Sequence, residues 1–192
     1  SGAAGGAGAA YVFAPPSTTQ SQTIQVNQGW NLISLPLQPT TTLNASALLG
    51  ALLQNNSSSQ LVALFSLSST GWSRPVIAQP GQPPSNNIPL SVGTGYLLYS
   101  DVQNSYTEQG TVPAGGPTWQ LSLGWNLVGL SAASANGLTA DTVLEGVRTS
   151  GSGGQLAALF SLRLGNWQPF RIDQSGTFTG NPSFQLAPGQ GY

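Results

Sequence analysis

Few side chains in this sequence could carry out chemistry. The 192 residues include no His, Cys or Met, and the four cations are all Arg. Without His, Cys or Lys, this chain cannot form the Ser–His, Cys–His or Schiff-base arrangements that activate a nucleophile. The remaining candidates are the acids, which are Asp101, Glu108, Asp141, Glu145 and Asp173.

Asp141 and Glu145 are the acids whose spacing best suits catalysis. They lie four residues apart in a predicted helix, so both carboxylates share one face. The alternative is a solvated helix face, with Asp141 near the N-terminus and Glu145 paired with Arg148. The matching positions of the repeat described below are Ser46 and Gly50, which favours the alternative. We therefore predict that the protein is not an enzyme.

Cofactor and metal sites are not indicated either. No acid-rich loop has the ligand spacing of a calcium site. The Gly-rich stretches 115–117 and 150–154 lack the Lys and the strand–helix context of a phosphate cradle. We expect no cofactor and no metal.

The composition limits the kinds of partner and the location that we expect for this protein. Only 5% of residues are charged, against 39% hydrophobic, and the net charge is −1. This excludes the basic footprint of a nucleic-acid binder, and no stretch reaches the roughly 18 apolar residues of a membrane span. A surface with so little charge repulsion suits contact with further copies of itself or with a matrix. The lack of oxidisable Cys and Met fits an extracellular or cell-surface protein, for which the chain would be the mature form.

An internal duplication organises the chain. At an offset of 95 residues, GWNL at 29–32 matches GWNL at 124–127, and ALFSL at 63–67 matches ALFSL at 158–162. After one inserted residue, Gly95-Tyr96 matches Gly191-Tyr192. The predicted organisation is an N-terminal tail at 1–22 with a strand-like segment at 10–14, a first repeat at 23–100, a linker at 101–117 and a second repeat at 118–192.

Periodicity predicts a mainly β fold with one short helix in each repeat. In the first repeat, TIQV and WNLISLPL are split by Asn27-Gln28-Gly29, which is typical of a hairpin. Helical spacing spans 43–53 and 138–147, with Thr42 or Asn44 and Thr139 as caps. The predicted fold is therefore two tandem, homologous, small β-sandwich or barrel-like modules.

Aromatic residues recur in both repeats at matching positions. They could form a carbohydrate-binding platform, because aromatic faces stack on sugar rings, or they could belong to the cores. Their recurrence within apolar alternation favours the core. The predicted core landmarks are Trp30, Phe65, Trp72, Tyr96, Trp125, Phe160 and Trp167.

The order of GWNL, an ALFSL strand, a lone Trp and a closing GxGY resembles β-rich repeats of large secreted and surface-attached bacterial proteins. In those repeats GWN(L/I) opens the module and a GY strand closes it. The resemblance covers both repeats and implies an extracellular, adhesive or scaffolding role. It implies no catalytic residue.

The two repeats differ at their closing strand. The first ends in Tyr96-Leu97-Leu98-Tyr99-Ser100, whereas the second stops at Gly191-Tyr192, which predicts an open sheet edge and an apolar groove. Residues 10–14, Ala-Tyr-Val-Phe-Ala, form an apolar segment outside both repeats. We hypothesise that Tyr11, Val12 and Phe13 fill the gap beside Gly191 and Tyr192 of a neighbouring subunit.

The two ends of the chain also allow alternatives to strand addition between subunits. Residues 10–14 could fold back onto their own chain, or the native chain could continue past Tyr192. Residues 10–22 could also match the segment between the repeats, since Tyr11 aligns with Tyr106.

The function predicted from the sequence is an extracellular structural protein. It would be a self-assembling subunit of a filament, a pilus-like fibre or a surface layer, with copies of itself as head-to-tail partners. The alternative is a carbohydrate- or surface-binding adhesin module. Glycans are possible attachments, because Asn44, Asn55 and Asn56 lie in N-x-S sequons.

Overall fold

A computed structural model describes residues 18–84, 86–115, 118–134, 137–150 and 156–192. The predicted mainly β fold is confirmed, and its sheets are antiparallel; each half of the chain carries one α-helix. We call residues 18–115 the first half and residues 118–192 the second half. No helix in the described parts of the chain is long and apolar enough to cross a membrane.

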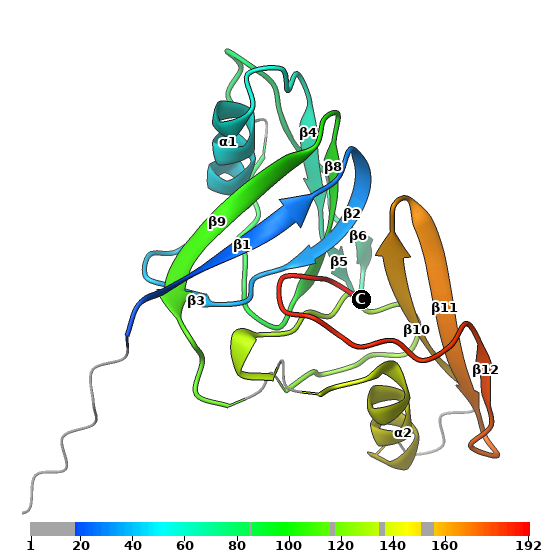
Figure 1. The fold of residues 1–192 in the computed structure, drawn as a ribbon. Coiled ribbons are helices and arrows are strands. Elements are labelled where there is room, and N and C mark those ends of the chain that lie inside the picture. The colour runs from blue at the N-terminus through cyan, green and yellow to red at the C-terminus, as the bar shows by residue number, and fades with distance from the viewer. Residues whose placement is uncertain (1–17, 85, 116–117, 135–136, 151–155) are drawn as a thin grey trace, which may run out of the picture.

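The first half is built on two layers of strands with a helix against them (Figure 1). A four-stranded antiparallel sheet has the order β2-β8-β4-β7, and a second sheet has the order β1-β9-β3. The strands are β1 Gln20–Val26, β2 Gly29–Ser34, β3 Gln38–Pro39, β4 Val62–Phe65, β7 Val76–Ala78, β8 Gly95–Ser100 and β9 Asn104–Thr111. A short hairpin pairs β5 Leu67–Ser68 with β6 Gly71–Trp72.

The predicted hairpin between β1 and β2 is wrong. The two strands are consecutive in the chain, but they belong to different sheets. A corner separates them, because Gly29 adopts a positive φ of 93° and Asn31 bonds back across the turn. The Asn31 Oδ1 accepts the N–H of Asn27 at 2.8 Å, and its Nδ2 donates to the carbonyls of Asn27 and Gly29. The GWN motif therefore redirects the chain from one sheet to the next.

The segment 101–117 is not only a linker as predicted. It contains β9, which pairs antiparallel with β1 from Gln20↔Gly110 to Val26↔Asn104. Its alternating pattern places Tyr106 and Glu108 toward the core, where Ile24 and Val26 are buried. The polar composition of β9 gives no strand signal in the sequence, which is why this strand was not predicted.

The second half contains a smaller sheet with the order β10-β11-β12. Its strands are β10 Leu156–Arg163, β11 Asn166–Asp173 and β12 Phe178–Gly180, and a 3₁₀ turn spans Ala132–Ser134. The described residues that match β1 and β2, which are 115, 118–121 and 124–129, form no named strand. The same corner recurs in them, since Asn126 bonds to the N–H and carbonyl of Ser122 and to the carbonyl of Gly124.

Both predicted helices are present. α1 spans Ala45–Asn55, with Asn44 as the N-cap whose side chain accepts the N–H of Ala47 at 2.9 Å. α2 spans Ala140–Ser150. Leu48, Leu49 and Leu52 are buried in the core of the first half, whereas the buried residues of α2 are Ala140 and Leu144.

The two halves contact one another through a reciprocal set of hydrogen bonds. Gly95 N donates to Leu127 O at 3.2 Å, and the matching Gly191 N donates to Leu32 O at 3.1 Å. Ser34 N donates to Gly189 O, and the matching Gly129 N donates to Gly93 O, both at 3.0 Å. Residues that match in the sequence repeat therefore make matching contacts across the boundary between the halves.

Candidate functional site

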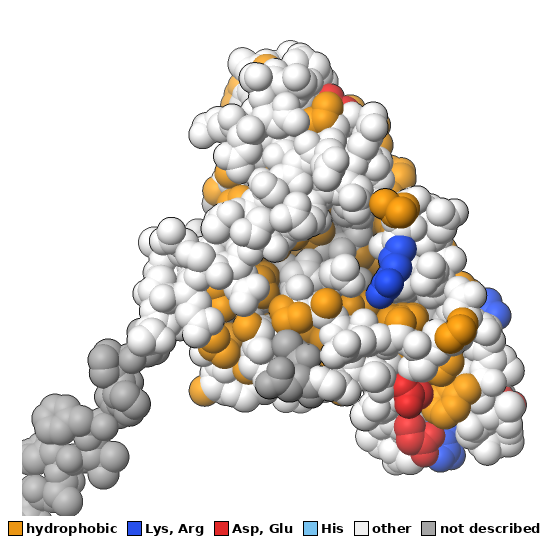
Figure 2. All heavy atoms as spheres, viewed as in Figure 1, with side chains coloured by type: hydrophobic (Ala, Val, Ile, Leu, Met, Phe, Trp, Pro, Cys, Tyr) orange, Lys and Arg blue, Asp and Glu red, His pale blue; other side chains and the backbone are white. Residues whose placement is uncertain are grey.

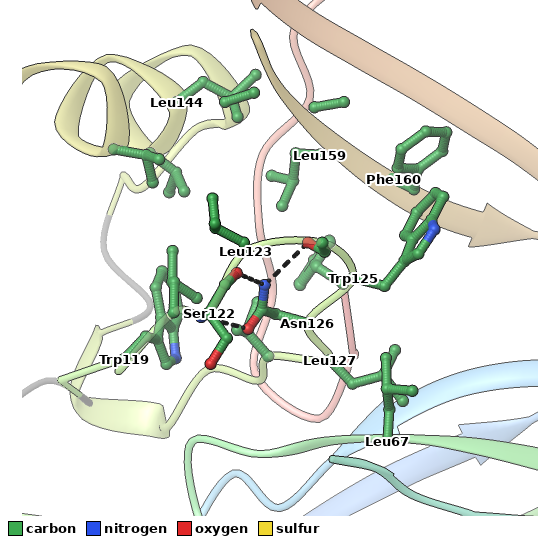
Figure 3. A pocket seen from close by; sticks show the side chains of 18 of the residues that line it. Leu67, Trp119, Ser122, Leu123, Trp125, Asn126, Leu127, Leu144, Leu159 and Phe160 are labelled. Carbon is green, nitrogen blue, oxygen red and sulfur yellow. Dashed lines mark hydrogen bonds between the residues drawn. The ribbon is translucent and has the colours of Figure 1, made fainter. Parts of the chain in front are cut away.

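An open apolar groove of about 600 Å³ lies between β10 and residues 121–128 (Figure 3). The groove predicted for the second half is thus present. Its walls come mainly from the second half, with three residues of the first half at one side. The lining includes Leu32, Leu67, Trp72, Trp119, Leu121, Leu123, Trp125, Leu127, Val143, Val147, Ala157, Ala158, Leu159, Phe160 and Tyr192.

The groove occupies the place that β8 fills in the first half. There, β8 lies between β2 and β4, with Asn31↔Leu98↔Leu64 and Trp30↔Tyr99↔Ala63 as rows across the three strands. The matching residues of the second half are 124–128 and β10, and no strand of the described chain lies between them. β10 is therefore an edge strand whose free side faces the groove.

The start of the closing strand is present in both halves. In the first half Ile33 pairs with Tyr96 and Ser34 with Gly95. In the second half Tyr192 exchanges two backbone hydrogen bonds with Val128, at 2.8 and 2.9 Å, and Gly129 bridges to Gly191. The groove thus begins directly after the position of Tyr192.

The two closing tyrosines are anchored in the same way. The Tyr96 hydroxyl accepts the N–H of Ser91 at 2.8 Å, and the Tyr192 hydroxyl accepts the N–H of Ala187 at 2.8 Å. Burial raises the pKa of both phenols above their usual range, so both stay protonated. Gly191 and Tyr192, predicted as subunit-contact residues, are buried at the end of the groove.

An aromatic pair spans the strand position in each half. The Trp30 and Phe65 rings lie 5.7 Å apart across β8, and Trp30 also contacts Tyr99 at 5.2 Å. The Trp125 and Phe160 rings are 5.1 Å apart across the groove, although no strand lies beneath them. Trp125 is 71% exposed, compared with 44% for Trp30. The same pair of rings therefore spans the strand position in the first half and the open groove in the second.

The core assignment of the aromatic landmarks is largely wrong. Trp30, Trp72, Trp125 and Trp167 are exposed, and Phe65 and Phe160 are half-buried. Only Tyr96 of the seven landmarks is buried. Three of these indoles, Trp30, Trp125 and Trp167, contact another ring. The alternating pattern of apolar residues could not reveal this exposure, because it does not tell which face of a strand meets the core.

Residues beside the groove are exposed although their counterparts are buried. Ile24 and Val26 of β1 are 4% and 1% exposed, whereas Leu121, the match of Val26, is 45% exposed. Trp119, the match of Ile24, donates its Nε1 hydrogen to the Gly129 carbonyl at 3.1 Å. Leu121 and Leu123 were not predicted as site residues, although the repeat alignment with Val26 could have signalled the first of them.

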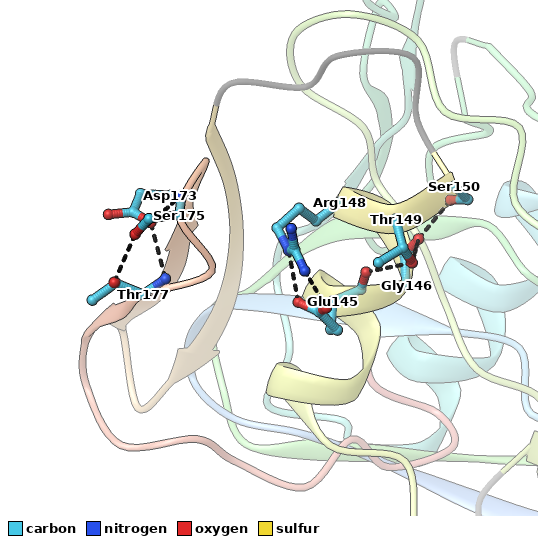
Figure 4. A network of polar contacts seen from close by, with 8 residues as sticks. All are labelled: Glu145, Gly146, Arg148, Thr149, Ser150, Asp173, Ser175 and Thr177. Atoms are coloured by element: carbon cyan, nitrogen blue, oxygen red, sulfur yellow. Dashed lines mark hydrogen bonds and ion pairs between the residues drawn. The ribbon is translucent and has the colours of Figure 1, made fainter.

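The carboxylates do not form a catalytic pair. Asp141 accepts a hydrogen bond from Ser183, and Glu145 pairs with Arg148, whose Nε lies 2.8 Å from Glu145 Oε2 (Figure 4). These contacts lower the pKa of each carboxyl, so both are ionised and neither is a poised proton donor. Asp173 lies in a separate turn, where it accepts hydrogen bonds from Ser175 and Thr177.

Metal ligation has no candidate in the described residues. None of their His, Cys, Asp and Glu side chains form a group of three or more that could hold an ion. Figure 2 shows a surface that is mostly uncharged, with the acids and arginines gathered largely over the second half. The groove is lined by apolar side chains, with Arg148 and Asp173 among its polar members. Its chemistry is that of apolar burial and backbone pairing.

The side chains of all three sequon asparagines form hydrogen bonds. Asn44 caps α1, Asn55 Nδ2 donates to the Ser105 carbonyl at 3.0 Å, and Asn56 Nδ2 donates to the Gln103 carbonyl at 3.1 Å. A glycan on Nδ2 of Asn55 or Asn56 would interfere with the latter two bonds. Tyr11, Val12 and Phe13, the other predicted contact residues, lie outside the described residues.

Comparison with known proteins adds no assignment. No family model matches the chain, and neither the curated proteins nor the solved structures contain a significant match.

Proposed function

We propose that this protein is an extracellular structural protein, the self-assembling subunit of a filament, pilus-like fibre or surface layer. Residues 10–14 of one subunit add as a strand to the groove of the next. The observation that carries the proposal is the apolar groove between β10 and residues 121–128, at the place where β8 completes the first half.

The groove and the segment match in chemistry. In the first half, β8 is flanked by β2 and β4. One face of β8 packs on the core and the other carries ring side chains, so both faces are apolar. Such a strand requires a continuous apolar run, which Tyr11-Val12-Phe13 supplies. Burying each of these side chains contributes roughly 1.5–3 kcal/mol, and pairing with the free edge of β10 adds backbone hydrogen bonds.

A contact of this kind joins different surfaces of the two partners. The donor surface is the N-terminal segment, and the acceptor surface is the groove of the second half. Heterologous contacts continue indefinitely unless the rotation closes a ring, so a chain of subunits results. The low charge of the whole sequence, 5% of residues, removes the repulsion that would oppose close packing of many copies.

Deletion of the donor segment tests this function. Negative-stain microscopy and sedimentation should show polymers for the full chain and for a variant lacking residues 1–9, which is the matched control. A variant lacking residues 1–14, and the milder double variant Tyr11→Ser with Phe13→Ser, should remain monodisperse. Circular dichroism should show the same fold for all four proteins.

Two results would overturn the proposal. One is polymerisation that survives unchanged in the variant lacking residues 1–14. The other is a full chain that stays monomeric at every concentration, which would point to a groove filled in cis or by residues that follow Tyr192 in a longer protein.

Carbohydrate binding is a second candidate, because the indoles are exposed rather than buried. Trp125, Phe160 and Trp167 form one ring cluster, with centroid separations of 5.1 and 6.4 Å, and aromatic faces of this kind stack on sugar rings. Titration with soluble oligosaccharides should then shift the tryptophan fluorescence of the full chain, and Trp125→Ala should abolish the shift. An unchanged spectrum across neutral and acidic oligosaccharides would argue against this candidate.

A further inference from the structure

The four-stranded sheet of the first half is apolar on both faces. Side chains along a strand point alternately to the two faces. One set, which includes Ile33, Leu64 and Leu98, packs in the core with residues of α1 and β1. The opposite set is apolar as well, and we call it the outer face. It consists of Trp30, Leu32, Ala63, Phe65, Ile77, Leu97 and Tyr99.

The strand register joins the outer face into one surface. Trp30 lies beside Tyr99, and Tyr99 lies beside Ala63. Ala63 in turn lies beside Ile77, so one row of side chains crosses all four strands. Three strand spacings make this row about 14 Å wide. The outer face is therefore a continuous apolar surface and not a set of scattered side chains.

The second half covers part of the outer face and leaves the rest open. Leu32 is buried, and it lines the groove together with residues of the second half. Trp30 and Ile77, at the two ends of the row, are 44% and 40% exposed. An apolar sheet face normally packs against another layer, so an uncovered one marks a contact surface.

We infer that the outer face binds a second copy of this chain, so that neighbouring fibres pack side by side. This contact is separate from the head-to-tail contact in the groove. The inference rests on the proposed function for the presence of fibres, and it adds a second direction of assembly.

The absence of charge on the outer face favours another copy as the partner. None of the side chains of the outer face is charged, whereas binding to a lipid surface usually needs Lys or Arg beside the apolar side chains. Only 5% of the whole sequence is charged, so a second copy offers an equally uncharged surface. Leu32 also lines the groove, so the outer face adjoins the proposed joint between subunits.

The composition of the outer face suits a protein better than a sugar chain. Its polar side-chain groups are the Trp30 indole N–H and the Tyr99 hydroxyl. A sugar carries many hydroxyl groups and needs several hydrogen-bonding partners beside an aromatic ring. The cores of protein interfaces, by contrast, are rich in Trp, Tyr and Phe and poor in charged residues.

A single contact through the outer face should be weak. Interfaces of standard size bury roughly 800 Å² on each partner. The open part of the outer face depends on a few large side chains, mainly those of Trp30 and Ile77 with part of Tyr99. Two free subunits should therefore stay apart at low concentration. Fibres, which would present the outer face once in each subunit, should associate because many contacts act together.

Ile77→Arg tests the outer face. Ile77 is the outward residue of the edge strand β7, so a longer polar side chain there leaves the core in place. In a side-by-side contact the guanidinium would be buried without a partner. The fraction of protein that pellets at low speed as associated fibres should therefore fall about tenfold or more. Negative-stain microscopy should show single fibres, at an unchanged critical concentration for polymerisation, because the groove is intact.

Two variants are matched controls. Leu164→Arg makes the same change of charge at a leucine that is 81% exposed, in the turn between β10 and β11. Ile77→Val keeps the outer face apolar. Both should pack side by side as the wild type does, and circular dichroism should show the same fold for all the proteins.

Three outcomes would overturn the inference and leave the proposed function intact. The first is side-by-side packing that survives unchanged in Ile77→Arg, or wild-type fibres that never associate. The second is a folded Ile77→Arg variant that forms no fibres, which would place Ile77 in the head-to-tail contact. The third is single wild-type fibres that bind soluble oligosaccharides or phosphatidylcholine vesicles in a way that Ile77→Arg abolishes.

A wild-type chain that forms no fibres would overturn the proposed function, and sedimentation equilibrium would then decide the inference. A reversible dimer at high concentration that Ile77→Arg abolishes, and Leu164→Arg does not, would support the outer face as a contact between copies. A monomer at every concentration would overturn both.

Discussion

The two halves of this protein show what a closing strand does for a small β module. In the first half, β8 and β9 cover the core, so that Leu64, Leu98, Ile24 and Val26 are buried. In the second half, the matching Leu159 is still buried, at 8% exposed, but it lines a groove, and Leu121, the match of Val26, is exposed. Sequences that share GWNL and ALFSL therefore give one closed core and one open core. The difference lies in the strands that flank these motifs.

The comparison also shows that some features do not depend on the closing strand. The corner made by Asn31 recurs at Asn126, and the anchoring of Tyr96 recurs at Tyr192. These contacts are local, because each joins residues at most five positions apart. Hydrogen bonds between residues close in the sequence thus form in both halves, whereas burial of the core depends on segments that are distant in the sequence.

The largest effect is expected at the glycines where the halves meet. A Cβ on Gly95 would lie 2.7 Å from Val128 O, and a Cβ on the matching Gly191 would lie 2.8 Å from Ile33 O. Because backbone atoms cannot move aside cheaply, Gly95→Val and Gly191→Val should each lower the free energy of unfolding by on the order of 3–5 kcal/mol. Urea unfolding measures both.

The control for this prediction lies in the helices. Gly50 lies within α1 and Gly146 within α2, and a Cβ on either meets nothing within 4 Å. Gly50→Ala and Gly146→Ala should each stabilise by up to about 1 kcal/mol. If Gly95→Val were as well tolerated as the helix variants, the reciprocal contact would not hold the halves together.

Matching leucines test whether the second core is open. Leu64→Ala removes a fully buried side chain from a closed core and should cost about 3 kcal/mol. Leu159 is also buried, at 8% exposed, but it lines the groove, so Leu159→Ala loses the burial of the side chain without closing off a new cavity and should cost about 2 kcal/mol in the monomer. Urea unfolding of both variants below the concentration of assembly gives the comparison. Equal costs would show that the groove is closed in solution.

The stability of the protein should depend on pH through a carboxyl group of the first half. The Glu108 carboxyl is buried, Leu37 N donates to its Oε2 at 3.2 Å, and its Oε1 has no partner. Burial raises the pKa of Glu108 from 4.5 to about 7. The folded state therefore holds this proton more tightly than the unfolded state. The stability should fall as the pH rises from about 4.5 to about 7, by on the order of 3 kcal/mol, and change no further above that range.

Glu108→Gln should remove this dependence and stabilise the protein at a pH of about 8, as thermal unfolding across pH would measure. The acids of the second half shift the other way, since hydrogen bonds lower the pKa of Asp141 and Asp173. If Glu108→Gln kept the full slope of stability against pH between 4.5 and about 7, a group other than Glu108 would be responsible for that slope.

Part of this architecture could be predicted from the sequence. The helices, the β class and the groove follow from periodicity and from the alignment of the repeats, because these report local burial. The pairing of β1 with β9 could not be predicted, because β9 is polar and its partner lies about 80 residues away. The exposure of Trp30 and Trp125 was missed for a related reason. Alternation identifies two faces of a strand but does not say which one meets the core.

The place of the groove has a mechanical consequence. In the assembly that we propose, a strand added between β10 and residues 124–128 would be bonded along both edges, so pulling two subunits apart would require both rows of hydrogen bonds to break. Leu32, Leu67 and Trp72 of the first half also line this groove. The joint between subunits would therefore clamp the two halves of the acceptor as well, and resistance to pulling would rise at both junctions together.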